Sequence, residues 1–78
     1  MPKNKPLAEK ELAAIAKDFR QRAGIRRAQA ARDMRVSQTS IFNAEESPEQ
    51  GLVKLRVRMI EAYSKFKVRG PVYLLEDT

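Results

Sequence analysis

Residues 38–43, QTSIFN, hold side chains that can contact the edges of nucleic-acid bases. Gln38 and Asn43 each carry an amide that can pair in bidentate fashion with adenine, and Thr39 offers a hydroxyl and a methyl group. Phe42 adds an apolar ring that can pack against a thymine methyl group. In a helix these residues form i,i+4 pairs on one face. The sequence thus predicts base-contacting chemistry along one side of a short helix.

The sequence lacks the residue types that most often serve in catalysis and metal binding. The 78 residues contain no cysteine and no histidine, which excludes a thiolate metal site, cysteine catalysis and the usual general base. We therefore predict no enzyme activity, no catalytic residue, no metal and no cofactor. The apolar runs are shorter than the roughly 18 residues of a membrane span, and the N-terminal segment lacks the apolar centre of a signal peptide. We expect a cytoplasmic, nucleoid-associated protein without a membrane partner.

Basic residues lie in two blocks along the chain. Residues 1–43 carry ten Lys and Arg against four Asp and Glu, and residues 52–70 carry six against one. Residues 44–51, with three glutamates, separate the two blocks. Such blocks in a chain of net charge +6 are typical of a protein that binds a polyanion, most often nucleic acid.

Apolar spacing predicts several helices in one small domain. A helix over 7–22 ends before Gly24 and is indicated by Leu12, Ile15, Ala16 and Phe19. An alanine-rich segment predicts a second helix over 26–34, and Ser37 can cap a third over 38–45. The SPEQ segment that follows contains a proline and could begin a further element.

The segment 52–66 fits both a strand and a helix, and its length without a turn signal favours the helix. As a helix it carries a second apolar stripe of Val53, Val57 and Ile60, which a partner subunit could cover. Three basic residues on this helix are expected to serve solubility: Lys54, Arg56 and Arg58.

The β-rich run 72–75 predicts one short strand near the C-terminus. A lone strand in a helical domain lacks a backbone partner, so we expect either a local pairing or pairing across a dimer. The candidate dimerisation residues are Val72, Tyr73, Leu74 and Leu75. The predicted organisation is a mobile basic arm over 1–6, a DNA-binding domain over 7–67, and a strand and tail over 68–78.

Residues 19–47, FRQRAGIRRAQAARDMRVSQTSIFNAEES, resemble the DNA-binding domain of the phage-repressor and Cro-like helix-turn-helix family, also called the xenobiotic-response-element family. The similarity extends over about residues 8–66. It implies an all-α domain of four to five helices with a short C-terminal strand. It also implies a structural ion pair between Arg20 and Glu45 that ties the first helix to the third.

The resemblance implies a DNA-contacting surface as well. The positions of Gln38, Thr39 and Asn43 are those that family members use to contact bases, and Phe42 lies on the same face. Phosphate contacts are expected from the start of the second helix and from the turn after it, through Arg26, Arg27, Arg35, Ser37 and Ser40.

Three departures from the family pattern are visible. Arg35 stands where the family usually has glycine, at a turn position with positive φ, so we expect a left-handed strain of roughly 1 kcal/mol. Arg26 replaces the usual Ser or Thr cap of the second helix. Glu46 and Glu49 place acid where relatives often carry groups that contact phosphate.

The sequence therefore predicts a small transcriptional regulator of the repressor type that binds double-stranded operator DNA as a homodimer. One alternative is an antitoxin-type regulator that also binds a toxin protein. Another is a module that binds RNA without sequence preference through its basic surface. The RNA alternative lacks the usual aromatic stacking platform, because the chain has only five aromatic residues and most lie at core spacing.

Overall fold

The computed structural model describes residues 6–7, 9–69 and 73–77, with side chains over 11–68. Four helices and three short strands occur in this part of the chain. The prediction of a mostly helical domain is confirmed. In order, the elements are β1 (Pro6–Leu7), α1 (Glu9–Arg22), α2 (Arg27–Met34), α3 (Gln38–Glu46), α4 (Val53–Tyr63), β2 (Phe66–Arg69) and β3 (Tyr73–Asp77).

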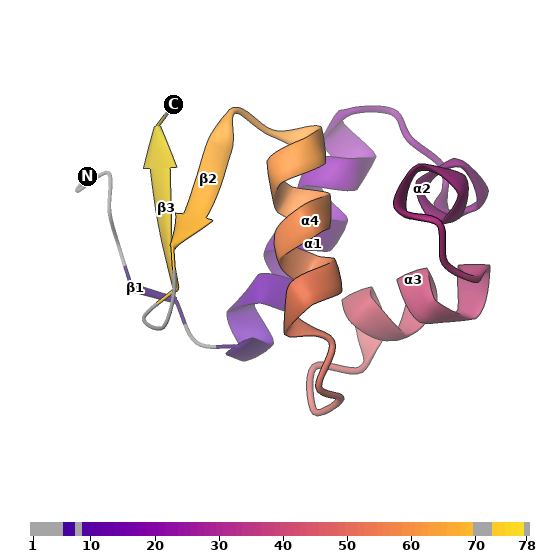
Figure 1. Ribbon diagram of the computed structural model, residues 1–78, viewed down its shortest axis with the longest axis horizontal. Coiled ribbons are helices and arrows are strands. Elements are labelled where there is room, and N and C mark those ends of the chain that lie inside the picture. Colours follow the sequence, from indigo (N-terminus) through magenta and orange to yellow (C-terminus); the bar gives the residue numbers. More distant parts are fainter. Residues whose placement is uncertain (1–5, 8, 70–72, 78) are drawn as a thin grey trace.

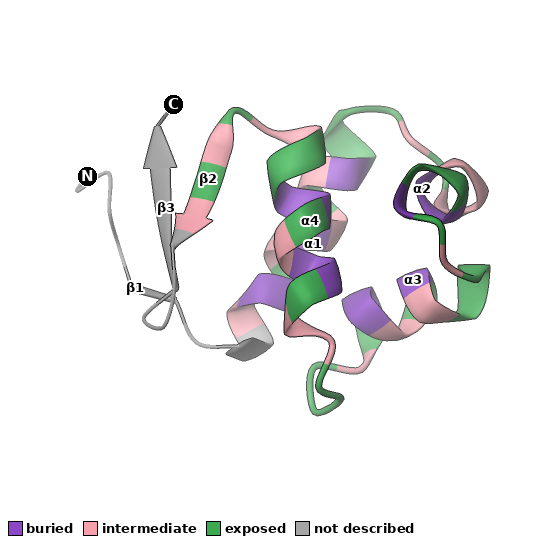
Figure 2. Cartoon of the chain, viewed as in Figure 1, coloured by how far each residue is buried: buried purple, intermediate pink, exposed green. Residues whose placement is uncertain are grey.

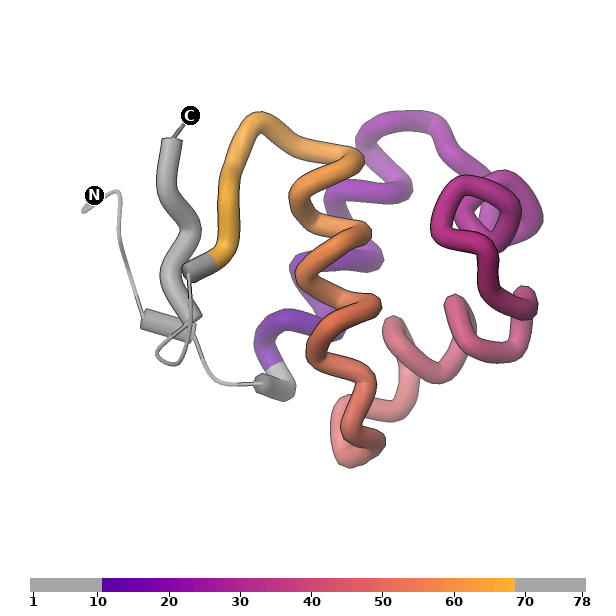
Figure 3. The backbone as a smooth tube through the Cα atoms, in the orientation of Figure 1, coloured from indigo at the N-terminus to yellow at the C-terminus, as the bar shows by residue number. Residues whose placement is uncertain are grey.

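The elements form three groups along the long axis of the molecule (Figure 1). α1 and α4 pack against each other in the middle, and α2 and α3 lie at the end opposite the strands. The chain measures 33 × 25 × 17 Å along its principal axes. The path of the backbone in Figure 3 shows α2 and α3 joined by a short turn. None of the described helices is long and apolar enough to cross a membrane.

The core lies where the four helices meet, as the buried residues in Figure 2 show. Leu12 and Ala16 of α1 pack in one cluster with Met59 and Ile60 of α4, and the predicted apolar spacing of α1 places Leu12 and Ala16 inward. Ile60 is therefore a core residue, whereas the other members of its predicted second stripe, Val53 and Val57, are half-buried. α2 and α3 close the core with Ala30, Ala31, Met34, Ile41 and Ala44.

The strand predicted near the C-terminus is present and is paired locally, which was one of the two expected alternatives, although the described part of the domain has three strands and not one. β3 is the middle strand of a three-stranded antiparallel sheet with the order β1, β3, β2. Val68 of β2 pairs with Leu75 of β3, and Leu7 of β1 pairs with Tyr73. Leu74 also has backbone partners on both sides, whereas Val72 lies outside the described residues. A missing strand partner therefore gives no reason to assign residues 72–75 to a dimer.

The partner strand β2 begins at Phe66, the last residue of the segment that was predicted to be the fourth helix. α4 ends at Tyr63 because the Ser64 hydroxyl donates to the carbonyl of Ile60 and accepts from the backbone N–H of Phe66, at 3.1 Å. Phe66 then packs its ring against Phe19, with 5.8 Å between the ring centroids. The Phe66 ring thus packs on α1 from a strand and not from the helix predicted over 52–66.

Arg56 corrects the prediction that the basic residues of the fourth helix serve solubility. Its side chain is buried, with an exposed fraction of 0%, inside the helical core. The guanidinium donates to the carbonyl oxygens of Ala44 at 2.8 Å, Ser47 at 2.8 Å and Gln50 at 2.9 Å. These bonds satisfy carbonyls at the end of α3 and in the segment that follows. The SPEQ segment is held as turns and does not begin a helix.

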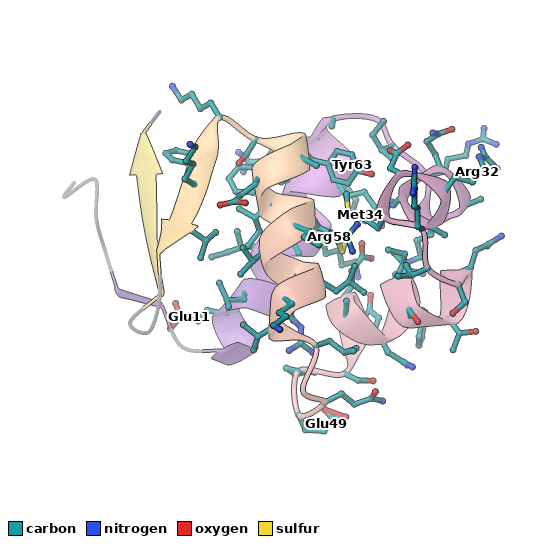
Figure 4. All side chains as sticks on the ribbon, in the orientation of Figure 1. Glu11, Arg32, Met34, Glu49, Arg58 and Tyr63 are labelled. Carbon is teal, nitrogen blue, oxygen red and sulfur yellow. The ribbon has the colours of Figure 1, made fainter. Side chains whose placement is uncertain are left out.

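Two further side chains connect α4 to α2 and point towards it in Figure 4. Arg58 donates to the carbonyl oxygen of Met34 at 2.8 Å, at the end of α2, and the Tyr63 hydroxyl donates to Asp33 at 2.7 Å. The Tyr63 hydroxyl lowers the pKa of Asp33, and Gln29 adds to the lowering. Burial raises the pKa of Tyr63, and the Asp33 carboxylate raises it further.

The turn between α2 and α3 has the left-handed residue that the family resemblance implies. Arg35 has φ 59° and ψ 47°, and it is the only non-glycine residue with positive φ in the described part of the chain. This conformation lets the N–H of Val36 donate to the carbonyl of Ala31 at 3.0 Å, which closes the end of α2.

We predict that Arg35→Gly raises the free energy of unfolding by about 0.5 kcal/mol. Relief of left-handed strain of roughly 1–2 kcal/mol outweighs the greater unfolded-state freedom of glycine, roughly 0.5–1 kcal/mol. Urea unfolding measures the difference, and Arg35→Lys is the control because it keeps both the charge and the β-carbon. If Arg35→Gly is no more stable than Arg35→Lys, the left-handed conformation of Arg35 does not strain the backbone.

Candidate nucleic-acid interface

α3 presents two different faces. Ser37 caps its N-terminus by accepting from the backbone N–H of Ser40 at 3.0 Å, as the sequence predicts. Ile41 and Ala44 are fully buried against the core. Among the predicted base-contacting residues, three are exposed and Asn43 is half-buried; the exposed ones are Gln38, Thr39 and Phe42. The structure thus collects these four residues on the outer side of one helix.

A buried ion pair fixes α3 to α1. Arg20 Nη2 donates to Glu45 Oε1 at 3.0 Å, and Arg20 Nε donates to the other carboxylate oxygen. The Glu45 side chain has an exposed fraction of 0%. The remaining nitrogen, Arg20 Nη1, donates to the carbonyl oxygen of Ile25 at 2.6 Å and so holds the segment between α1 and α2. The structure brings together the pair that the family resemblance implies.

Arg27 enters the same network from the start of α2. Its Nε donates to Glu45 Oε1 at 3.0 Å, and its Nη2 donates to Glu46 Oε2 at 2.9 Å. Arg27 was expected to contact phosphate, and its hydrogen bonds to these two carboxylates were not predicted. The guanidinium is already engaged within the protein, although about a third of the side chain is exposed.

Glu46 is held by two cations from two helices. Lys17 of α1 forms an ion pair with it, and Arg27 of α2 forms the other. The Lys17 ammonium, which donates a hydrogen bond to the carboxylate, lowers the pKa of Glu46, and Arg27 adds to the lowering. The cluster thus contains three cations, Lys17, Arg20 and Arg27, against the carboxylates of Glu45 and Glu46. It retains one positive charge.

Phe42 is the only large apolar side chain that is exposed in the described part of the chain, at 47%. The Arg27 guanidinium carbon lies 5.0 Å from the centroid of the Phe42 ring, which is the geometry of a cation–π contact. One residue therefore contacts both the buried carboxylate and the exposed ring.

The other predicted phosphate contacts lie around the start of α2 and the start of α3. Arg26 precedes α2 with an extended backbone, is exposed, and forms no ion pair with a described residue. Arg35 is exposed at the turn. The hydroxyls of Ser37 and Ser40 lie 3.0 Å apart and hydrogen-bond to each other. Of the predicted set, Arg26 and Arg35 are the cations open to an external anion.

An open groove lies beside this surface, between the α2–α3 turn and the start of α4. Its volume is about 530 Å³. Apolar side chains line much of it, and Lys54 and Arg58 stand at its edge. The apolar lining consists of Val36, Leu52, Val53 and Leu55.

Sequence reasoning missed the part that Lys17 plays in the ion-pair cluster. Lys17 precedes Arg20 by three residues and so occupies the same face of α1. The spacing of Lys17 and Arg20 could have predicted a second ion pair between α1 and α3, but only when combined with the position of Glu46 directly after Glu45. The two acidic residues that depart from the family pattern have different environments. Glu46 forms ion pairs with Lys17 and Arg27, whereas Glu49 is exposed on a turn (Figure 4).

Comparison of the chain with models of protein families, with curated proteins and with solved structures finds no match. Within the described residues, no group of acidic side chains is arranged to hold a metal ion.

We predict strong coupling between Arg20 and Glu45 in a double-mutant cycle with Arg20→Met and Glu45→Met. Glu45→Met leaves the buried guanidinium of Arg20 without a carboxylate and should cost about 3 kcal/mol. Arg20→Met should cost less, because Arg27 remains bound to the Glu45 carboxylate. The double variant should cost less than the sum of the singles by about 1–3 kcal/mol. Urea unfolding measures all four proteins.

The exposed i,i+4 pair Asp18–Arg22 provides the matched control, since its charges are 3.0 Å apart but open to water. Its cycle should give a coupling energy below about 0.5 kcal/mol. Equal coupling in the two cycles would contradict the importance of burial.

Proposed function

We propose that the protein is a helix-turn-helix domain that binds double-stranded DNA sequence-specifically, with α3 in the major groove, and acts as a small transcriptional regulator of the repressor type. The observation that carries the proposal is the outer face of α3. Gln38 and Thr39 are exposed there on a helix whose opposite face is buried and whose end is fixed by the Arg20–Glu45 pair. A rigid helix with exposed amide and hydroxyl groups suits base recognition.

The charge around α3 supports DNA as the partner. Arg26 and Arg35 are exposed near the two ends of α2, and Arg35 lies two residues before Ser37, the capping residue of α3. Cations in these positions can bind phosphates while α3 contacts bases between them. The aromatic residues favour a duplex over single-stranded RNA, because Phe19 and Phe66 pack on each other and only Phe42 is exposed among the described aromatic residues.

A homodimer forms part of this proposal, and the groove at the start of α4 is the surface that we assign to it. Leu52 and Val53 leave apolar surface open there, beside Val36 of the α2–α3 turn. A two-fold contact between two such grooves would bring the two α3 helices into a symmetric arrangement. Symmetric DNA half-sites need such an arrangement, with a spacing of about 34 Å. A toxin partner remains an alternative.

Selection of bound duplexes from a random pool tests the function. A two-fold symmetric consensus is expected, with at least one adenine in each half-site for Gln38 or Asn43. Competition with single-stranded DNA and structured RNA of equal length should displace little of the selected duplex. Displacement by RNA at equal concentration, or a pool without a consensus, would overturn the proposal.

We predict that Gln38→Ala and Arg26→Ala weaken binding in different ways. Gln38→Ala should cost about 1–3 kcal/mol on the selected duplex, relax the preference at one base pair and leave the salt dependence unchanged. Arg26→Ala should weaken selected and scrambled duplexes alike and lower the salt slope by about one. Titrations at several salt concentrations measure both effects.

Gln21→Ala is the control for the first variant, because it makes the same change at an exposed position of α1 outside the proposed interface. Lys67→Ala, an exposed cation on β2, is the control for the second and should leave the salt slope unchanged. A loss of equal size on the selected and scrambled duplexes in Gln38→Ala would show that α3 does not discriminate between bases.

We also predict that Val53→Glu breaks the dimer, because it places a charge in the apolar groove. Sedimentation equilibrium should show monomers, and binding to the selected duplex should weaken far more than binding to a scrambled one. Ala62→Glu adds the same charge at an exposed position of α4 outside the groove and should remain dimeric. A dimeric Val53→Glu protein would place the contact elsewhere.

A further inference from the structure

We propose that the Phe42 ring, held in place by Arg27, recognises the 5-methyl group of a thymine in the bound duplex. Phe42 is then a specificity-determining residue, and Arg27 is its positioning residue and not a primary phosphate contact. The inference rests on the proposed function, because it needs α3 in the major groove. It adds a chemical identity for one contact: an apolar methyl group on a pyrimidine.

The position of Phe42 gives the first argument. Phe42 is 47% exposed on the same helix face as Gln38 and Thr39, whereas the other described phenylalanines, Phe19 and Phe66, are half-buried and pack on each other. A phenyl ring forms no conventional hydrogen bond to a base edge. The thymine methyl is the one apolar group that a base pair presents in the major groove, so it is the group that such a ring can favour.

The contacts of Arg27 give the second argument. Its guanidinium lies 5.0 Å from the ring centroid and is bound at the same time by Glu45 at 3.0 Å and by Glu46 at 2.9 Å. Glu45 is itself buried and bound by Arg20. The cation over the ring is therefore anchored to three helices, which restricts the motion of the ring before any ligand binds.

A restrained ring suits recognition of a small group. Burial of one methyl group contributes little, so the contact discriminates only if ordering the side chain does not cancel the gain. Because the guanidinium covers one face of the Phe42 ring, the ring can still offer its other face and its edge to a methyl group. The Glu45 and Glu46 carboxylates compete with phosphate for Arg27, which favours the positioning role over a phosphate contact.

Replacement of thymine by deoxyuridine tests the proposal, since it removes the methyl group and keeps the base pair. Each thymine of the selected duplex is replaced singly, and dissociation constants are measured for the full-length wild-type protein. Replacement at one position in a half-site should weaken binding about fourfold, the effect of one buried methyl group. Phe42→Ala should bind thymine and deoxyuridine duplexes equally at that position.

Arg27 variants test the positioning role. Arg27→Met should bind the duplex but discriminate less than twofold between thymine and deoxyuridine, and Arg27→Lys should recover part of the fourfold effect through its charge. Arg26→Met is the matched control, because it removes the neighbouring exposed cation and should keep full discrimination. Circular dichroism confirms that each variant is folded, and a folded Arg27→Met with full discrimination would overturn the positioning role.

The outcomes separate this inference from the proposed function. If no duplex is preferred over a scrambled one, both fail. If a duplex is preferred but no thymine replacement changes its affinity, or if Phe42→Ala keeps the effect, the methyl contact alone is overturned. If Phe42→Ala instead turns a dimer into a monomer in sedimentation, the ring belongs to a protein interface, and that also overturns the proposal.

Discussion

The buried carboxylate of Glu45 imposes the constraint on which this end of the molecule depends. An ionised carboxylate without exposed surface must be bound by cations, because its desolvation is otherwise too costly. Arg20 supplies one cation from α1 and Arg27 supplies another from α2, so three helices must meet at one residue of α3. The orientation of α3 follows from this requirement as much as from its apolar face.

The same requirement links the interior of the domain to its surface. Arg27 neutralises Glu45 on one side and lies over the exposed Phe42 ring on the other, and Glu46 holds it from a third direction. A side chain that was expected to face only solvent and phosphate therefore has internal partners. The positive charge of Arg27 is therefore largely compensated by carboxylates of the protein. The exposed cations that can bind an external anion lie beside the cluster, at Arg26 and Arg35.

Local signals in the sequence predicted much of the helical part. The cap at Ser37 depends on neighbours a few residues away, whereas the left-handed Arg35 was implied by the family resemblance. A local pairing of the C-terminal strand was one expected alternative, but its partners could not be predicted in this way, because Phe66, the first residue of β2, fitted the predicted helix. The burial of Arg56 depends on backbone carbonyls that come close to it only in the folded chain. The spacing of charged residues in the sequence therefore does not predict it.

The contacts of Arg56 have a consequence for how this domain tolerates sequence change. The guanidinium binds main-chain oxygens of Ser47 and Gln50, and every residue type carries such an oxygen. The side chains of the segment between α3 and α4 are thus not needed to fix its backbone conformation. This segment can vary in composition while its course stays constant, whereas Arg56 itself cannot be exchanged for lysine without losing the planar fork that reaches several carbonyls at once.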